Sequence, residues 1–222
     1  MAMNQPDNNA RIIVVIGATG QQGGAVARAL AATGRWRVRA VVRNPASSVA
    51  LCLRDHGIEV IHGNMDRPES LSAALAGAYG VYAMQPSVRG TEIEIRQGAA
   101  IIDAACFADI RHFIYASVGG ADRQSGVPHF ESKWVIEQNL VRSGLPATVI
   151  RPAFFMENFV RLPLRIVLMA LPRRYMPRHK PLQMIAIDDI GNDPRLFRDY
   201  PQLSKNRRNN LIFNKMSYGV YR

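Results

Sequence analysis

The feature that most constrains the fold is an apolar run, residues 12–16, that is followed at once by glycines at positions 17, 20 and 23. Five consecutive aliphatic residues are typical of a strand that is buried on both faces of a parallel sheet. A helical pattern begins directly after the glycines, at residues 25–30. Strand, glycine turn and helix in this order are the context in which a glycine-rich turn binds the diphosphate of a dinucleotide. We therefore expect the first strand–helix unit of a nucleotide-binding sheet here.

Each glycine of this turn has its own physical role. Gly17 would let the chain turn sharply off the strand, Gly20 would let the backbone approach a pyrophosphate, and Gly23 would let the helix lie close to the strand. The start of the helix would then present free N–H groups and a positive dipole end to the phosphates. The spacing G-x-x-G-x-x-G is a variant of the usual G-x-G-x-x-G motif, and the alternative is a tight turn that binds no ligand.

Five more apolar segments follow, and helical patterns separate them. The strands are predicted at residues 36–42, 58–62, 81–84, 112–117 and 147–151. The helices between them are predicted at residues 46–56, 66–75, 93–109 and 132–143. Six strands that alternate with helices predict an α/β fold with a Rossmann-type, doubly wound parallel sheet. This domain would extend over residues 11–151.

The two ends of the chain depart from this alternation. Residues 1–10 are polar and lack the apolar core of a signal peptide, so we expect a disordered leader. Prolines interrupt the apolar segments of residues 152–191, which predicts part of a small C-terminal lobe over the strand ends, with one more strand at 182–187. Residues 192–222 form a short, basic, Asn-rich tail, and the sequence alone does not determine whether they fold.

The net charge of +11 raises the question of nucleic-acid binding. Much of the positive charge is concentrated in residues 161–180 and 191–222, so the rest of the chain is nearly neutral. The sequence has no helix-turn-helix, zinc-finger or aromatic-interleaved basic pattern. We therefore expect attraction to an anionic cofactor or an acidic protein partner rather than direct binding of nucleic acid.

Several other classes of protein are disfavoured by the sequence. Its apolar runs fall short of the roughly 18 residues that a membrane span requires. The histidines lack metal-ligand spacing, and the sequence has no H-E-x-x-H or C-x-x-C motif, so we expect no metal site. Cys52 and Cys106 lie in helical patterns, and we expect both to be buried free thiols of a cytoplasmic protein, since that compartment is reducing.

An arginine, Arg43, directly follows the second predicted strand. In dinucleotide-binding folds that prefer NAD, an acidic residue near this point binds the ribose 2′-hydroxyl, whereas an arginine suits the 2′-phosphate of NADP. The planar guanidinium also matches the geometry of a phosphate. Arg43 therefore favours NADP(H) over NAD(H) as the cofactor, and the alternative is a solvated surface arginine.

The helix after the fifth strand carries the candidate catalytic residues. A short-chain dehydrogenase places a tyrosine four residues before a lysine here; the tyrosine donates a proton, and the lysine lowers its pKa and holds the nicotinamide ribose. This chain has Lys133, but His129 stands at the tyrosine position. His129 could donate a proton near neutral pH or lie on the surface at a helix start. Lys133 could bind the ribose without catalysis, or it could be a solvated lysine paired with Glu137 one turn on.

Two further segments lie where a cofactor would be expected. Ser117 ends the fifth predicted strand and faces the expected cofactor cleft, where it could position a carbonyl group or simply cap the loop. Residues 154–158 follow the sixth strand, and their side chains belong either to the core or to the wall of a nicotinamide pocket.

Four segments together resemble the NmrA-like family of atypical short-chain dehydrogenases/reductases. They are residues 17–24, 42–45, 129–133 and 151–159. The resemblance covers residues 11–191 and implies a Rossmann domain that binds NAD(P), with a small C-terminal lobe. It also implies that Arg43 contacts the 2′-phosphate and that Lys133 contacts the ribose. The residues that the resemblance places on the diphosphate are Gly17, Thr19, Gly20, Gln22 and Gly23.

The chain departs from the family pattern at two places. Asn64 stands where the family commonly has aspartate, which puts the adenine contact at that position in question. The family pattern also stops after residue 191, whereas relatives usually continue for many tens of residues and complete the second lobe. We therefore expect a shortened and divergent C-terminus with an incomplete second lobe, which would disfavour efficient turnover.

The resemblance leaves three hypotheses about function. The family includes negative regulators of transcription factors and NADPH sensors, and replacement of the catalytic tyrosine, as at His129, is typical of that branch. We therefore expect an NADP(H)-binding, redox-sensing regulator that acts through a protein partner with little catalysis. The alternatives are an NAD(P)H-dependent reductase of quinones or related carbonyl compounds, and an interaction protein that has lost its cofactor. The sequence does not determine the partner, the substrate or the oligomeric state.

Overall fold

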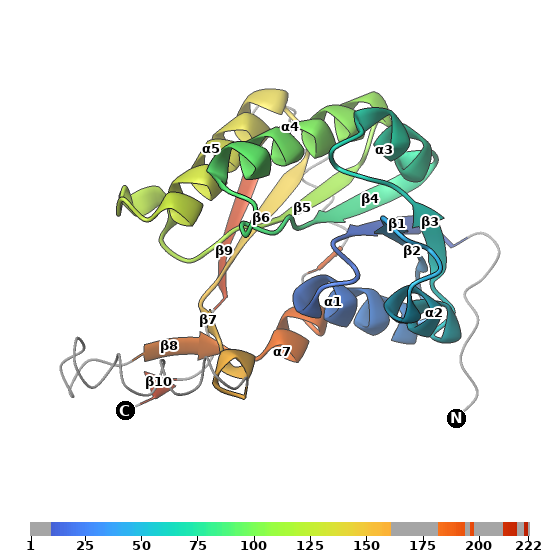
Figure 1. Ribbon diagram of the computed structural model, residues 1–222, viewed down its shortest axis with the longest axis horizontal. Coiled ribbons are helices and arrows are strands. Elements are labelled where there is room, and N and C mark those ends of the chain that lie inside the picture. The colour runs from blue at the N-terminus through green and yellow to red at the C-terminus, as the bar shows by residue number, and fades with distance from the viewer. Residues whose placement is uncertain (1–9, 161–181, 194–195, 198–210, 217–219, 222) are drawn as a thin grey trace.

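The structure is a computed structural model of the chain, and it describes residues 10–160, 182–193, 196–197, 211–216 and 220–221. In this part of the chain one parallel sheet lies between two layers of helices (Figure 1). Residues 1–9 of the predicted leader and residues 161–181 of the predicted lobe lie outside the described residues, as does much of the predicted tail.

The main sheet has seven strands in the order β3-β2-β1-β4-β5-β6-β9, and every neighbouring pair is parallel. The strands are β1 (Ile12–Ile16), β2 (Arg37–Val42), β3 (Glu59–His62), β4 (Ala78–Ala83), β5 (His112–Ala116), β6 (Ala147–Pro152) and β9 (Leu211–Met216). The chain adds strands outward in one direction from β1 to β3 and then returns to continue on the other side with β4. The predicted Rossmann-type, doubly wound sheet is confirmed, and its switch point lies between the carboxyl ends of β1 and β4.

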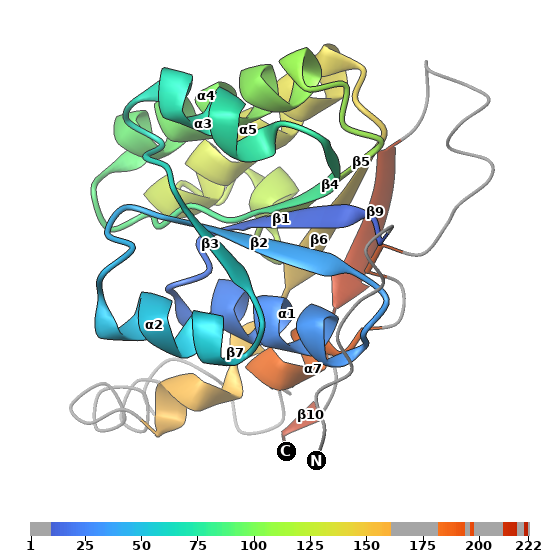
Figure 2. The same cartoon turned by 90° about the vertical axis from the view of Figure 1, so that its right-hand side faces the viewer.

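Two layers of helices cover the faces of the sheet (Figure 2). The helices are α1 (Gln21–Ala32), α2 (Ser48–Asp55), α3 (Pro68–Leu75), α4 (Thr91–Phe107), α5 (Pro128–Ser143) and α7 (Ile187–Gly191). The first two and α7 lie on one face, and α3, α4 and α5 lie on the other. The buried residues accordingly form two clusters, one under each layer. Among the described helices, none is both long enough and apolar enough to cross a membrane.

Some element boundaries differ from the sequence-based prediction. Strand β4 begins at Ala78, three residues before the start predicted at residue 81, so Gly80 lies inside the strand. Helix α5 begins at Pro128, which places His129 on its first turn and Lys133 on its second. The prediction that both cysteines are buried is wrong, because Cys52 and Cys106 are exposed on the outer faces of their helices, although both are free.

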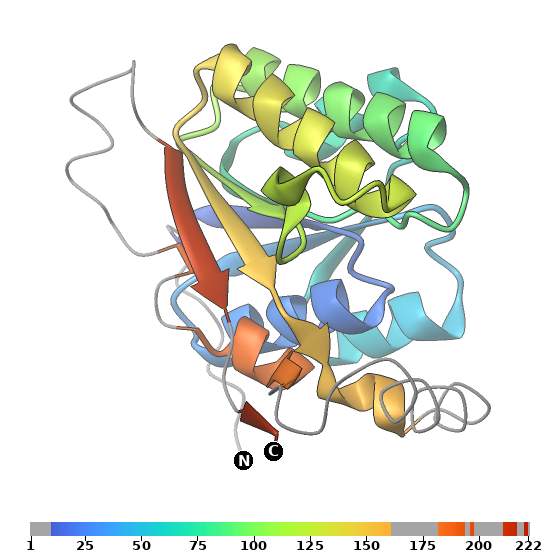
Figure 3. The same ribbon diagram turned by 90° about the vertical axis from the view of Figure 1, so that its left-hand side faces the viewer.

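The C-terminal part of the chain contributes to the same core. Strand β9 lies beside β6 at the edge of the sheet (Figure 3), inside the segment that reads as a basic tail. Helix α7 packs tightly on α1, since a Cβ atom at Gly191 would lie 2.9 Å from the carbonyl oxygen of Ala25. The Phe197 ring is 1% exposed and lies against Gly80, where a Cβ atom would meet it at 2.7 Å.

A second, three-stranded sheet follows β6. It consists of β7 (Phe154–Phe155), β8 (Leu182–Ile185) and β10 (Val220–Tyr221), in the order β10-β8-β7. The strand predicted at residues 182–187 is thus present as β8 and is shorter at its C-terminal end. A one-turn 3-10 helix at Met156–Phe159 leads away from β7.

Candidate functional site

The turn after β1 has the close backbone contacts that only glycine allows. Gly17 has a φ of +82°, and a Cβ atom there would lie 2.6 Å from the carbonyl oxygen of Met84. A Cβ atom at Gly23 would lie 2.3 Å from the carbonyl oxygen of Gly17, so the first turn of α1 rests on the turn itself. Gly20 has more space, because its Cβ atom would lie 3.3 Å from that same oxygen. The turn therefore brings the start of α1 to the carboxyl end of β1.

The N-terminus of α1 presents backbone donors at this edge of the sheet. Gly20 is the N-cap residue and provides no side-chain cap. No described residue accepts a hydrogen bond from the backbone N–H groups of residues 21–23. Thr19 and Gly20 are exposed, whereas the side chain of Gln22 is buried, with 6% of the residue exposed. The contact predicted for Gln22 could therefore involve its backbone N–H and not its side-chain amide.

Arg43 lies at the same edge, one strand away from the glycine turn. It directly follows β2, which pairs with β1. Its side chain is exposed, and it forms no ion pair with another described residue. The guanidinium group is thus available to an anionic ligand at the carboxyl ends of β1 and β2.

Lys133 is a buried lysine with a carboxylate partner on another helix. The residue is 9% exposed, and its Nζ lies 3.0 Å from Oε1 of Glu94 on α4. The Nζ also donates a hydrogen bond to the carbonyl oxygen of Ala116 at 3.4 Å and lies 5.5 Å from the centroid of the Tyr115 ring. The alternative of a solvated lysine paired with Glu137 is wrong, because Lys133 lies on the inner face of α5, where α4 and β5 surround it.

Glu137 has different partners, which include the candidate Ser117. Arg151 on β6 donates to both carboxylate oxygens of Glu137, from Nη2 at 2.6 Å and from Nε at 3.1 Å. The pKa of Arg151 is raised, chiefly by this hydrogen bond. Arg151 also reaches Asp122 at 2.8 Å. The Ser117 hydroxyl is buried and donates to Glu137, so it is directed into the protein and not toward an open cleft.

The Tyr115 hydroxyl near Lys133 is a poor proton donor, and the His129 imidazole lies at the protein surface. Burial raises the pKa of the Tyr115 hydroxyl well above its ordinary value, and the nearby Glu94 and Glu137 carboxylates add to that shift. The Tyr115 hydroxyl accepts a hydrogen bond from Gln85 at 3.2 Å. His129 is exposed on the first turn of α5, where its ring packs edge-on against Phe130 at 4.6 Å between centroids.

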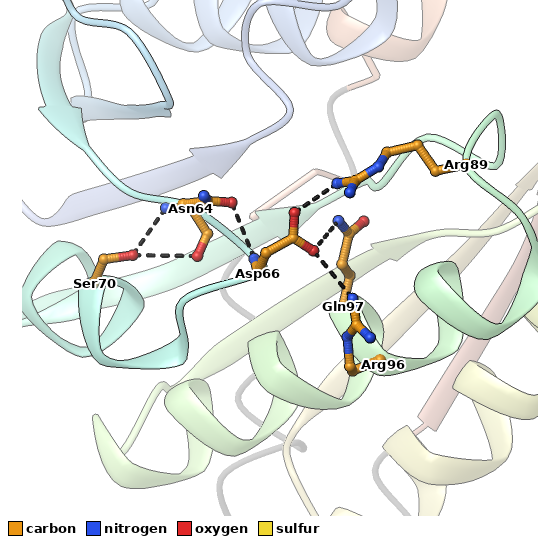
Figure 4. A network of polar contacts seen from close by, with 6 residues as sticks. All are labelled: Asn64, Asp66, Ser70, Arg89, Arg96 and Gln97. Atoms are coloured by element: carbon orange, nitrogen blue, oxygen red, sulfur yellow. Dashed lines mark hydrogen bonds and ion pairs between the residues drawn. The ribbon is translucent and has the colours of Figure 1, made fainter.

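A polar network joins the loop after β3 to the start of α4 (Figure 4). Asp66 accepts hydrogen bonds from Arg89 at 2.5 Å and from Gln97 at 2.9 Å, and Arg96 lies 3.6 Å away. These hydrogen bonds, that from Gln97 first, lower the pKa of the Asp66 carboxyl group. The side-chain oxygen of Asn64, where the family commonly has aspartate, accepts from the backbone N–H of Asp66 at 3.0 Å.

Sequence reasoning did not predict the residues of α4 that bind Lys133 and Asp66. Glu94 and Gln97 lie one turn apart on α4, and they bind Lys133 and Asp66 respectively. Spacing within one helix identifies neighbours three or four residues apart but not a partner on the next helix. A buried charge needs a counter-charge, but α4 has two glutamates in its first turn, Glu92 and Glu94, and the sequence does not mark which of them is buried.

The sequence is similar to one protein family and to several curated proteins. The model of the NmrA-like family matches residues 9–217. An NmrA-like family domain-containing oxidoreductase, FrzB of Cladobotryum sp., is 34% identical over 164 residues, which are 67% of this chain and 48% of that protein. An NAD(P)H azoreductase of Xenophilus azovorans is 32% identical over 151 residues, 67% of this chain and 50% of that protein. The chain spans about half the length of the curated relatives it matches.

Solved structures agree with the same assignment. The triphenylmethane reductase of Citrobacter sp., complexed with NADP(H), has a TM-score of 0.67 and 26% identity, covering 82% of this chain and 63% of that one. The negative transcriptional regulator NmrA, in complex with NADP, has a TM-score of 0.72 at 22% identity, covering 96% of this chain and 68% of that one, and shares the fold. The extent of the family match, into strand β9, together with these likenesses, shows that the chain belongs to the NmrA-like family.

Proposed function

We propose that this chain binds NADP(H) at the carboxyl ends of β1, β2 and β5 and acts as a redox-sensing regulator, through a protein partner and with little catalysis. The observation that carries the proposal lies at the start of α1, where the backbone N–H groups of residues 21–23 donate no hydrogen bond to a described residue. The exposed Arg43 lies at the same edge of the sheet. A phosphate-rich ligand supplies the acceptors that such a helix start lacks. The free thiols of Cys52 and Cys106 fit a cytoplasmic location.

The described residues fit the parts of a dinucleotide in order along this edge. The turn around Thr19 and Gly20 is exposed and would hold the diphosphate through backbone N–H groups. Arg43 would bind the 2′-phosphate, which NAD(H) lacks. Lys133 lies at the end of β5, across the switch point from β1, and would bind hydroxyls of the nicotinamide ribose.

The regulator role is supported by the positions of the possible proton donors around the site. The bound cofactor supplies a hydride, but reduction of a carbonyl also needs a proton donor beside the acceptor. Tyr115 has a raised pKa, Ser117 donates into the interior and His129 lies exposed on the first turn of α5. A site that binds the cofactor while its two hydroxyl groups are buried and its histidine lies at the surface suits a sensor of the NADPH to NADP ratio.

A reductase is the second candidate, and the names of relatives favour it. FrzB is named an oxidoreductase, and the Xenophilus azovorans relative is named an NAD(P)H azoreductase. The Citrobacter protein is named a triphenylmethane reductase. In this chain such a reaction would need an acceptor that takes its proton from water or from His129.

A calorimetric titration of the purified protein with NADPH, and separately with NADH, tests the proposal. We expect saturable binding that is tighter for NADPH. Binding of neither cofactor would overturn the proposal and leave the hypothesis of an interaction protein without cofactor. If NADPH binds, its consumption in the presence of quinone or dye acceptors then separates the two candidates, since steady oxidation that Lys133→Ala abolishes would favour the reductase.

A further inference from the structure

In the described part of the chain, two buried glutamates each form an ion pair with a basic side chain. Glu94 on α4 and Glu137 on α5 are both 0% exposed. The oxygens of Glu137 are bound by Arg151 and Ser117. Glu94 is the carboxylate that pairs with Lys133. The position of the Lys133 ammonium is therefore set by a residue on another helix.

The Glu94 carboxylate binds two consecutive residues of α5. Its Oε2 accepts a hydrogen bond from the Ser132 hydroxyl at 2.6 Å, and its Oε1 lies 3.0 Å from Nζ of Lys133. The two helices approach closely here, because a Cβ atom at Gly98 would lie 2.7 Å from Ile136. One side chain can therefore bridge α4 and α5 directly, and its charge lies within the first turn of α4, where the helix dipole favours an anion.

The remaining contacts of Lys133 direct its ammonium toward the end of the sheet. The Nζ donates to the carbonyl oxygen of Ala116, the last residue of β5, at 3.4 Å. An ammonium group has three donors. Ala116 accepts a hydrogen bond from one of them, and Glu94 balances the charge as an ion pair in which its Oε1 accepts no hydrogen bond. A donor is therefore left for a ligand at the carboxyl edge of the sheet. Without Glu94 the buried ammonium would lose its counter-charge and its fixed direction.

We propose that Glu94 is a positioning residue that acts on the cofactor only through Lys133, by holding the ammonium so that one donor is presented to the ribose hydroxyls. This inference rests on the proposed binding of NADP(H). Glu94 itself is fully buried and does not reach the edge of the sheet. Its effect on affinity must therefore vanish when Lys133 can no longer bind the ribose.

A double-mutant cycle on NADPH affinity tests this dependence. The proteins are the wild type, Glu94→Gln, Lys133→Met and the double variant, each titrated with NADPH by calorimetry and melted to check that it is folded. Loss of a charge-assisted hydrogen bond weakens binding by about tenfold or more, and we expect both single variants to show it. We expect the double variant to bind as Lys133→Met does, within about twofold.

The matched control is Glu137→Gln, which removes the other buried carboxylate. Glu137 pairs with Arg151, so its effect on NADPH affinity should be the same factor with and without Lys133→Met. Equal factors for Glu94→Gln in both backgrounds, or wild-type affinity in Glu94→Gln, would overturn the positioning role alone. Absence of binding in the wild type would overturn the proposed function together with this inference.

A second variant covers the case in which Glu94→Gln does not fold. Glu94→Asp keeps the charge but shortens the side chain, so the carboxylate can no longer reach Ser132 and Lys133 at the observed distances. We expect weaker NADPH binding in Glu94→Asp alone and no further loss when Lys133→Met is also present. Additive losses in this pair would contradict the inference in the same way.

Discussion

A Cβ atom at position 23 would lie 2.3 Å from the carbonyl oxygen of Gly17, so the first turn of α1 touches the turn that follows β1. Gly23→Ala must therefore displace one of the two segments. We expect a loss of about 1–3 kcal/mol in the free energy of unfolding, as for other overpacked sites, and loss of NADPH binding with it. Denaturant unfolding and calorimetric titration of the same preparation measure both effects.

Gly20→Val separates binding from folding at the same turn. A Cβ atom at Gly20 would lie 3.3 Å from the nearest oxygen, and the residue has an extended backbone that other residues adopt. We expect a folded protein that binds neither NADPH nor NADH, because the branched side chain would occupy the place of the pyrophosphate. Unchanged affinity in this variant would mean that the turn is structural and holds no diphosphate.

Arg43→Ala tests the preference for NADPH. The exposed guanidinium forms no ion pair with a described residue, so its removal should leave stability nearly unchanged. We expect NADPH affinity to fall by about 10- to 100-fold, the usual worth of a charge-assisted hydrogen bond, while NADH affinity changes little. Titration of the variant with each cofactor measures the difference.

Arg54→Ala is the matched control for Arg43→Ala. Arg54 is an exposed arginine in the last turn of α2, at the opposite end of that helix from Arg43, and its loss lowers the net charge equally. Its removal should affect the two cofactors alike and only slightly. If Arg43→Ala and Arg54→Ala behave in the same way, or if Arg43→Ala weakens NADH binding as much as NADPH binding, the 2′-phosphate assignment fails.

The sheet could be predicted from sequence because its signals are local. The run from Ile12 to Ile16, the glycines after it and the alternation of strands and helices each lie within a short window, and β1 to β6 follow that pattern. Strand β9 was not predictable in this way. It pairs with β6, more than sixty residues earlier in the chain, and a basic, Asn-rich sequence gives no local sign of that partner.

The sequence predicted where the candidate site lies, but not which residues form ion pairs within it. Residues at the ends of β1, β2 and β5 could be placed at one edge, because parallel strands end there together. The burial of Lys133 depends on how α4 packs against α5, and the exposure of the cysteines depends on which helix face turns outward. Such contacts between helices have no fixed spacing in the sequence, so the i to i+4 rule gave Glu137 where Glu94 is the partner.

Asp66 gives the protein a stability term that depends on pH. Its pKa is lowered from the ordinary value of 3.8 by hydrogen bonds from Gln97 and Arg89. A carboxyl group with a lowered pKa in the folded state stabilises that state above the unfolded pKa, and the contribution is lost as pH falls through the folded pKa. We expect Asp66→Asn to be less stable than the wild type at pH 7 and the difference to be smaller at pH 3, below the ordinary pKa of 3.8.

Asp109→Asn is the control for this pH dependence. The Asp109 carboxylate pairs with Arg111 at 2.9 Å, but both side chains are more than half exposed. An exposed pair contributes little, so thermal unfolding of Asp109→Asn should follow the wild type at both pH values. A stability difference between the wild type and Asp66→Asn that stays constant with pH would contradict the role given to the Asp66 carboxylate.

Arg151, whose side chain is 14% exposed, forms an ion pair with the fully buried Glu137, and removing one partner should cost more stability than removing both. Arg151→Met would leave the Glu137 carboxylate buried without its counter-charge, since Arg151 supplies two of its hydrogen bonds. We expect a loss of about 3–5 kcal/mol in the free energy of unfolding. Arg111→Met, which breaks an exposed pair, should cost about 1 kcal/mol or less in the same urea titration.

The double variant Arg151→Met with Glu137→Gln tests the cause of that loss. Removing both charges leaves a neutral amide that Ser117 can still bind, so much of the stability lost in Arg151→Met should return. The recovery follows because most of the expected cost is that of an uncompensated buried carboxylate and not that of the missing contact. A double variant less stable than Arg151→Met would show instead that Glu137 stabilises the end of β6 without its arginine.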